Sequence, residues 1–204
     1  MSIDRRELPN ILTIFRIALI PLIIVSFYVP WKITNIVVAF LFMLASITDY
    51  FDGYFARLYK VQSNFGRCFD PIADKLLVSV SLIMLVNFSN SVYILIPSIV
   101  IICREVLVSG LREFLATINV GVPVTKLAKW KTTFQMIAIT ALLLASKNSS
   151  YTYESIMDFF EVEPLLRISF NGVIEKIGTI LLNVSAILTI VTGYAYCMVG
   201  LKHM

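Results

Sequence analysis

Four aspartates lie between residues 49 and 74 of an otherwise apolar part of the chain. Asp49 and Asp52 are three residues apart and Asp70 and Asp74 are four apart, so on helices each pair lies on one face. Carboxylates that meet at one point repel each other, and a bound cation relieves this repulsion. Oxygen ligands suit hard divalent ions such as Mg²⁺, Mn²⁺ or Ca²⁺. The spacing therefore predicts a divalent-metal site.

The neighbours of the aspartates favour a ligand that carries phosphate. Gly53 follows Asp52 and has no Cβ, so a bulky ligand can approach the backbone there. Arg57 lies about one turn further on, and its forked guanidinium is suited to phosphate. Divalent ions, a guanidinium and clearance at a glycine together predict a phosphate or pyrophosphate site.

Simpler structural roles fit several of these residues when each is taken alone. Asp70 precedes Pro71, and an aspartate N-cap followed by proline is a common helix start. Asp74 could be a surface acid and Arg57 an anchor at the membrane interface. A helix that begins earlier, near Gly66, would instead place Gly66, Asp70 and Asp74 on one stripe and would bend at Pro71.

The composition places these residues in a membrane protein. The chain is 58% hydrophobic and 15% charged, with a mean hydropathy of +0.86, whereas soluble domains are about 45–50% apolar and about 25% charged. Apolar stretches near the roughly 20 residues that cross a bilayer are Ile11–Val29, Ile33–Ala56, Pro71–Phe88, Val92–Ala116, Leu127–Ser146 and Val173–Leu201. We predict an all-α integral membrane protein with six transmembrane helices, forming a single domain over residues 1–204.

Lysine and arginine residues divide unequally between the two sides of such a bundle. One side holds Arg5, Arg6, Arg57, Lys60, Arg67, Lys75, Arg112, Lys126, Lys129, Lys131 and Lys202. The other holds Lys32, Lys147, Arg167 and Lys176. The positive-inside rule places the richer side in the cytoplasm, together with both termini.

The second apolar stretch indicates how deep the aspartates lie. From Ile33 the apolar run ends at Thr48, which gives about 24 Å of helix at 1.5 Å per residue. Crossing about 30 Å of hydrocarbon requires the helix to continue through Asp49 and Asp52. A carboxylate at the bilayer centre costs about 2.5–3.5 kcal/mol. We therefore expect both side chains just inside the cytoplasmic boundary, facing protein or water.

Several other site types are disfavoured. Cys68, Cys103 and Cys197 are far apart in the sequence and form no pattern typical of a zinc site or a disulfide framework. His203, the single histidine, lies in the C-terminal tail, which argues against histidine-based catalysis. We expect no nucleic-acid partner.

Two segments concern the position of the chain in the membrane. Lys147–Gly172 carries acidic and aromatic residues and could lie in the interface or form a solvated loop with a loose helix. The opening "MSIDRRELPN" lacks the features of a transit peptide, which favours a bacterial plasma (inner) membrane over an organelle.

A second group of charges suggests a site for an anionic substrate. Arg104 and Glu105 lie inside the fourth apolar stretch, where an ionisable side chain indicates a functional site. Arg112 follows two turns later on a similar face, and Lys129 and Lys131 begin the fifth stretch on the same side. These cations could hold the phosphate group of an anionic substrate. An Arg104–Glu105 pair with neighbours, plus lysines that follow the positive-inside rule, is the alternative.

The aspartate region also resembles a known family. The pattern DxxDGxxAR begins at residue 49 and is followed, eight residues later, by GxxxDxxxD. Every fixed position matches the signature of the CDP-alcohol phosphatidyltransferases, and the six apolar stretches resemble that family's fold.

The resemblance implies two divalent ions, Mg²⁺ or Mn²⁺, held by the four aspartates, with Asp74 also acting as general base. It implies contacts with the CDP-linked lipid from Asn10, Thr13, Gly53, Arg57, Ser63 and Gly66. An ordinary helix cap explains Asn10 equally well, since it precedes the first span. Family resemblance also suggests a homodimer.

Within the family, the chain is most similar to members whose acceptor is glycerol 3-phosphate. The similarity covers most of residues 8–146 and rests on "LPNILTIFRIALIP", "ITDYFDGYFAR", "FDPIADKLLV", "CREVLVSGLREF" and "KWKTTFQMIA". It implies transfer of the phosphatidyl group from CDP-diacylglycerol to glycerol 3-phosphate near the cytoplasmic face. Alternatives are a family member with another acceptor (inositol phosphate, serine or a phospholipid), an aspartate-rich prenyltransferase and a divalent-cation transporter.

Overall fold

The computed structural model of the chain describes residues 8–29, 33–59, 64–118, 120, 126–146 and 164–201. Within these ranges it leaves the side chains of residues 8–9, 49–59, 64–65, 67–68, 126 and 164–171 undescribed. The helices are α1 (Leu8–Tyr28), α2 (Thr34–Tyr59), α3 (Asn64–Ser89), α4 (Val92–Thr117), α5 (Lys126–Ala145) and α7 (Pro164–Leu201). The described part is therefore all-α, as predicted, and each predicted span coincides with most of one helix.

Four of these helices contain segments long and apolar enough to cross a membrane. The segments are Asn10–Tyr28, Phe69–Ser89, Val92–Thr117 and Gly172–Leu201, and α2 contributes a shorter apolar segment, Thr34–Thr48. Large apolar side chains also cover the outside of the bundle, for example Val25, Ile96 and Ile187. Apolar length and an apolar exterior together indicate a membrane-embedded protein.

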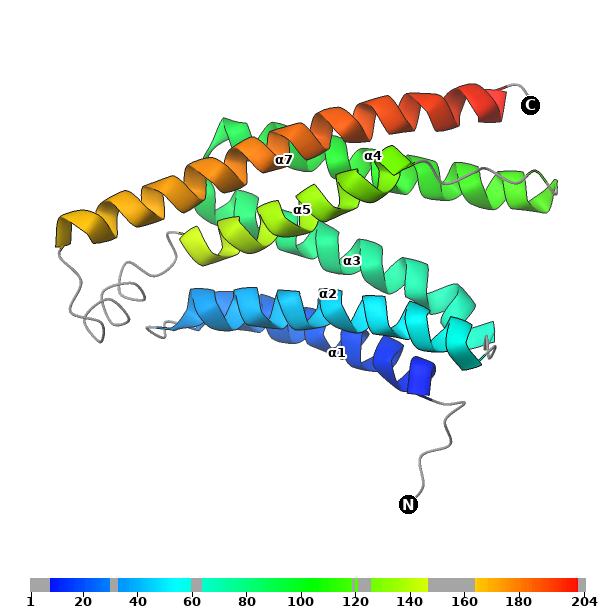
Figure 1. Cartoon of the computed structure of the whole chain (residues 1–204), viewed down its shortest axis with the longest axis horizontal. Coiled ribbons are helices and arrows are strands. Elements are labelled where there is room, and N and C mark those ends of the chain that lie inside the picture. The colour runs from blue at the N-terminus through cyan, green and yellow to red at the C-terminus, as the bar shows by residue number, and fades with distance from the viewer. Residues whose placement is uncertain are drawn as a thin grey trace, which may run out of the picture.

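The helices run alternately up and down the bundle (Figure 1). The start of α1, the end of α2, the start of α3 and the end of α7 lie at one end, which we call the α2–α3 end. At the other end, α3 passes into α4 through Asn90, whose φ of 48° is a left-handed conformation that asparagine tolerates. The described part of the chain thus begins in α1 and finishes in α7 at the same end of the bundle.

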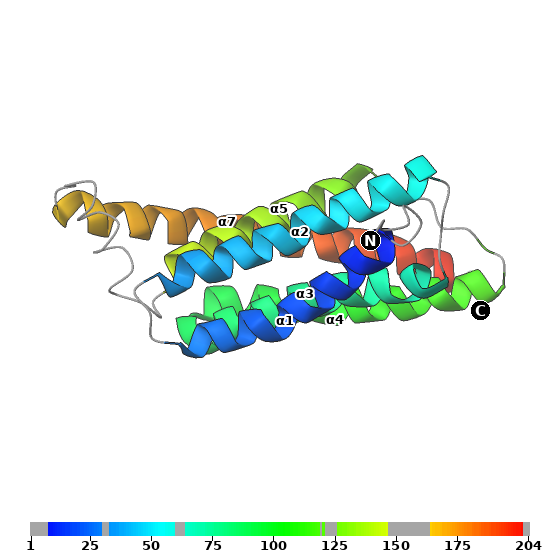
Figure 2. The same cartoon turned by 90° about the horizontal axis from the view of Figure 1, so that it is seen from below.

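The core joins two groups of helices. α1 packs on α2 and α3, α7 packs on α4 and α5, and contacts of α2 with α5 and of α3 with α4 connect the groups. Seen from below, α2, α5 and α7 lie in one layer and α1, α3 and α4 in the other (Figure 2). Phe42, Ile101, Ile139 and Leu182 are fully buried at these contacts. α7 approaches α4 closely because Gly200 has no side chain, and a Cβ there would lie 2.5 Å from Leu111 Cδ1.

Two helix starts differ from the predicted spans. α3 begins at Asn64, so Asp70 is not an N-cap and Pro71 lies inside the helix. α7 begins at Pro164, so the final residues of the expected Lys147–Gly172 connection are helical. The segment of α7 that is long and apolar enough to cross a membrane, Gly172–Leu201, agrees with the predicted span from Val173. Pro164 explains this start, because proline is well tolerated at the first helical position. The remaining part of that connection, residues 147–163, lies outside the described residues.

Candidate active site

The aspartate pairs lie at matching depths on α2 and α3. Asp52 is seven residues before the end of α2, and Asp70 is six residues after the start of α3. Asp49 and Asp74 are each ten residues from the same helix ends. Because the two helices are consecutive, antiparallel and in contact, equal rise per residue brings the two pairs to one level of the bundle.

This register fits a divalent-metal site, although the structure describes only half of its side chains. The side chains of Asp49, Asp52, Gly53 and Arg57 lie outside the described part, as does the whole of Ser63. Among the described side chains no group of three or more His, Cys, Asp or Glu could hold a metal ion. The two described aspartates contribute only oxygen ligands, which suit Mg²⁺ or Mn²⁺.

A residue of α1 fixes one of the aspartates. Thr13 Oγ1 donates a hydrogen bond of 2.5 Å to Asp70 Oδ1, and Thr13 is completely buried. Asn10, one turn earlier, is half-buried, and Gly66 is buried at the start of α3. The structure thus joins Thr13 and Asp70, which the sequence placed in one site although they are far apart in the chain.

Asp74 lines a small polar pocket formed by three helices. The cavity is about 30 Å³ and is lined by Asp74, Lys75 and Val78 of α3, Glu105 of α4, and Lys131, Thr132, Gln135 and Met136 of α5. Lys131 is buried and forms an ion pair with Glu105 across α5 and α4. This pocket brings the predicted base together with Lys131, one of the predicted anion-binding residues, and with Glu105.

Arg104 and Arg112 meet at one aromatic ring. The guanidinium carbon of Arg104 lies 5.6 Å from the ring centre of Tyr196 in α7, and that of Arg112 lies 5.7 Å from it. Arg104 also donates to Thr192 Oγ1 at 2.9 Å and to Glu105 Oε1 at 3.3 Å. Both guanidiniums are thus attracted to the face of a buried ring. The Arg104–Glu105 ion pair, which the sequence offered as the alternative to an anion-binding role, is present as well.

Comparison with known proteins decides the family. The family model described as "CDP-alcohol phosphatidyltransferase" matches residues 6–200. The chain belongs to the CDP-alcohol phosphatidyltransferase family. It is 47% identical over 196 residues to a Rickettsia felis protein and 48% identical over 196 residues to one from Rickettsia prowazekii, with 96% of each chain covered in both cases.

A more distant relative carries the same description. The chain is 34% identical over 196 residues to a Haemophilus influenzae protein, which covers 95% of this chain and 93% of the relative. These three proteins are named CDP-diacylglycerol–glycerol-3-phosphate 3-phosphatidyltransferases. The matches to these relatives include the part of the chain after residue 146, beyond the residues 8–146 that carry the family resemblance in the sequence.

The structure adds residues to this phosphatidyltransferase site that the sequence analysis missed. Lys75 lines the Asp74 pocket and donates to Ser109 of α4. Gln135 lines the same pocket, and Tyr196 lies under the two arginines. Arg16 is completely buried three residues after Thr13, on the same face of α1. Arg16 could have been identified from the sequence, because it is a charged residue within an apolar span. Gln135 and Tyr196 carry no charge that would mark them in the same way.

Lys129 differs from the other predicted cations. It is exposed near the start of α5 and does not line the Asp74 pocket. Lys131 lies two residues later and is buried. Because successive residues of a helix point in different directions, the two lysines occupy different environments. The structure therefore brings Arg104 and Lys131 into one network through Glu105, with Lys129 outside it.

A larger apolar groove adjoins the polar pocket. It has a volume of about 640 Å³ and is lined by side chains of α2, α5 and the start of α7, such as Met43, Ile137 and Ile174. Thr132 and Met136 line both the groove and the Asp74 pocket. The groove and the polar pocket are therefore neighbours along α5.

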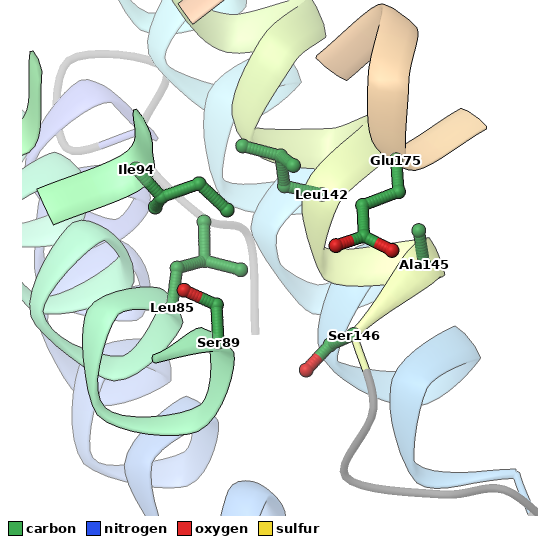
Figure 3. A pocket seen from close by; sticks show the side chains of 7 residues that line it. All are labelled: Leu85, Ser89, Ile94, Leu142, Ala145, Ser146 and Glu175. Atoms are coloured by element: carbon green, nitrogen blue, oxygen red, sulfur yellow. The ribbon is translucent and has the colours of Figure 1, made fainter. Parts of the chain in front are cut away.

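A pocket at the opposite end of the bundle provides a contrast. It has a volume of about 10 Å³ and is lined by Leu85, Ser89, Ile94, Leu142, Ala145, Ser146 and Glu175. Figure 3 shows the Glu175 carboxylate pointing between Leu142 and Ala145. Among the described residues, no lysine or arginine lines this pocket, in contrast to the Asp74 pocket.

Proposed function

We propose that this chain transfers the phosphatidyl group of CDP-diacylglycerol to sn-glycerol 3-phosphate, giving phosphatidylglycerophosphate and CMP. The observation that carries the proposal is the pocket in which Asp74 of the family signature meets Glu105 and Lys131. An acceptor needs its hydroxyl at a base and its phosphate at cations. Asp74 in the pocket and the Lys131–Glu105–Arg104 ion pairs beside it offer both. The names of the relatives support the same acceptor.

The donor lies on the aspartate side of this network. Asp49, Asp52, Asp70 and Asp74 would hold two Mg²⁺ or Mn²⁺ ions, which when bound neutralise the pyrophosphate and stabilise the CMP leaving group. Asn10, Thr13, Gly53, Arg57, Ser63 and Gly66 contact the CDP-linked lipid. Thr13 orients the Asp70 carboxylate through its hydrogen bond to Oδ1.

Asp74 supplies the proton acceptor. Its carboxylate takes the proton of the glycerol 1-hydroxyl as the hydroxyl oxygen attacks the phosphorus on the lipid side of the pyrophosphate. The bond from that phosphorus to the CMP oxygen breaks, and CMP leaves. Asp74 suits this role because it lines the pocket that the acceptor must enter.

The basic residues bind the acceptor's phosphate. Arg104 and Arg112 both contact the Tyr196 ring, and their guanidiniums would bind the phosphate oxygens of the acceptor. Lys131 adds charge within the pocket, although Glu105 already compensates part of it. Lys129 lies nearer the surface and would attract the anion from solution.

The apolar groove accommodates the lipid end of the donor. Its lining continues to Thr132 and Met136 of the Asp74 pocket, so an acyl chain there would leave the headgroup at the aspartates. We place the six helices across the plasma (inner) membrane with both termini cytoplasmic and the site near the cytoplasmic face. There a soluble anion and a bilayer lipid can both reach it. We further propose a homodimer.

CMP release by the purified protein in detergent tests this function. CDP-diacylglycerol and Mg²⁺ or Mn²⁺ are supplied, and glycerol 3-phosphate, inositol phosphate and serine are offered separately. We expect release with glycerol 3-phosphate and little with the others. Release with a different acceptor would retain the metal site but overturn the assignment of Arg104 and Arg112. No release from folded, metal-loaded protein would reopen the transporter alternative.

A further inference from the structure

Gln135 is the deepest polar residue on the buried face of α5. Lys131 precedes it by one turn and is 4% exposed, and Gln135 itself is 3% exposed. Beyond it the same face is apolar, with Ile139 and Leu142 buried. A ligand that enters from the cationic side therefore meets Gln135 where the polar part of the pocket ends.

The side-chain oxygen of Gln135 is buried without a hydrogen-bond partner among the described residues. The other polar pocket residues differ from it: Lys131 is paired with Glu105, and Lys75 donates to Ser109. A buried acceptor without a donor is costly, and such atoms are uncommon in folded proteins. The arrangement is explained if the ligand of this pocket supplies the missing hydrogen bond.

The chemistry of the acceptor identifies which of its groups could form a hydrogen bond with the Gln135 side chain. If the 1-hydroxyl lies at Asp74, the 2-hydroxyl on the neighbouring carbon lies in the same pocket, which Gln135 also lines. A hydroxyl can donate and accept, so it satisfies a primary amide in either orientation. Among the groups of glycerol 3-phosphate, the 2-hydroxyl is the one that neither the base nor the cations bind.

We propose that Gln135 binds the 2-hydroxyl of the acceptor and so makes the enzyme selective for a vicinal diol phosphate. This inference rests on the proposed function, because it assigns one more group of the same substrate. It also distinguishes glycerol 3-phosphate from a simple hydroxyalkyl phosphate, which would reach Asp74 and the arginines equally well. Sites built to bind a hydroxyl reject analogues that lack it, because a buried polar group is then left unpaired.

A comparison of two acceptors and two proteins tests the proposal. CMP release is measured with glycerol 3-phosphate and with 3-hydroxypropyl phosphate, which lacks the 2-hydroxyl, for the wild type and Gln135→Met. We expect the wild type to prefer glycerol 3-phosphate by about 10- to 100-fold in kcat/KM. Gln135→Met should lose most of this preference, with kcat/KM for 3-hydroxypropyl phosphate nearly unchanged. Asn87→Leu, an exposed amide of α3, is the matched control and should keep the preference.

One result would contradict the role of Gln135, and another would contradict the proposed function on which it rests. An equal loss with both acceptors in Gln135→Met would show that Gln135 only supports the packing of α5, while the proposed function would stand. A wild type that transfers to another acceptor but not to glycerol 3-phosphate would refute the proposed function itself. If Gln135→Met does not fold, Gln135→Asn keeps the amide and withdraws it by one methylene, and the same loss of preference is expected.

Discussion

The two halves of the candidate site differ in how far apart their residues lie in the sequence. The donor half is centred on one helical hairpin, with four aspartates between residues 49 and 74, to which α1 adds Thr13. The acceptor half draws Asp74 and Lys75 from α3, Arg104 from α4, Gln135 from α5 and Tyr196 from α7. A hairpin sets the relative positions of its residues by spacing and helical rise, whereas the acceptor half exists only when four helices have packed.

This difference predicts two kinds of mutational effect. In the proposed function, residues of the donor half act on the pyrophosphate, so their loss should lower kcat with any acceptor. Residues of the acceptor half would bind one substrate, so their loss should mainly raise its KM. Asp74 belongs to both halves and should show the largest effect.

Replacement of Asp74 by asparagine should lower CMP release at least about a thousandfold, because it removes a proton acceptor and a metal-ligand oxygen together. Steady-state CMP release with glycerol 3-phosphate measures the effect. Glu175→Gln is the matched control, since Glu175 is a half-buried carboxylate at the opposite end of the bundle. Near-normal turnover in Asp74→Asn would remove Asp74 from the mechanism.

The donor half could be predicted from sequence because its information is local. Helical spacing alone paired Asp49 with Asp52 and Asp70 with Asp74. The start of α3 could not be decided in the same way, since Asp70 before Pro71 is also a good cap. In the structure the helix begins at Asn64 and continues through Pro71, where one backbone hydrogen bond is lost. The Thr13–Asp70 bond and the burial of Ala73 support this longer helix.

The acceptor half could be predicted only where a residue was unusual in its surroundings. Arg104 and Glu105 attracted attention because charges are costly inside an apolar span. Gln135 and Tyr196 are ordinary residues for a membrane helix, and their meaning comes from neighbours on other helices. The start of α7 could have been predicted from the sequence, because proline is common at the first position of a helix, but the apolar stretch that indicates the membrane span begins only at Val173.

Replacement of Arg104 by glutamine should raise the KM for glycerol 3-phosphate by about 10- to 100-fold, the usual value of a hydrogen bond to a charged group. The KM for CDP-diacylglycerol should change little, because that substrate is bound by the donor half. Lys176→Gln, an exposed cation near the opposite end of α7, controls for the loss of one charge. Equal increases in both KM values would mean that Arg104 holds the helices together and is not specific to the acceptor.

The smallest expected effect tests how the acceptor half is held in place. Tyr196→Leu removes the ring beneath Arg104 and Arg112 and should raise the KM for glycerol 3-phosphate roughly three- to tenfold, with kcat nearly unchanged. Tyr196→Phe keeps the ring and should behave as the wild type. Tyr194→Leu, at a residue of the same helix that is 68% exposed, is the matched control. An unchanged KM in Tyr196→Leu would mean that hydrogen bonds to Glu105 and Thr192 suffice to position Arg104, and that the ring only fills space between α4 and α7.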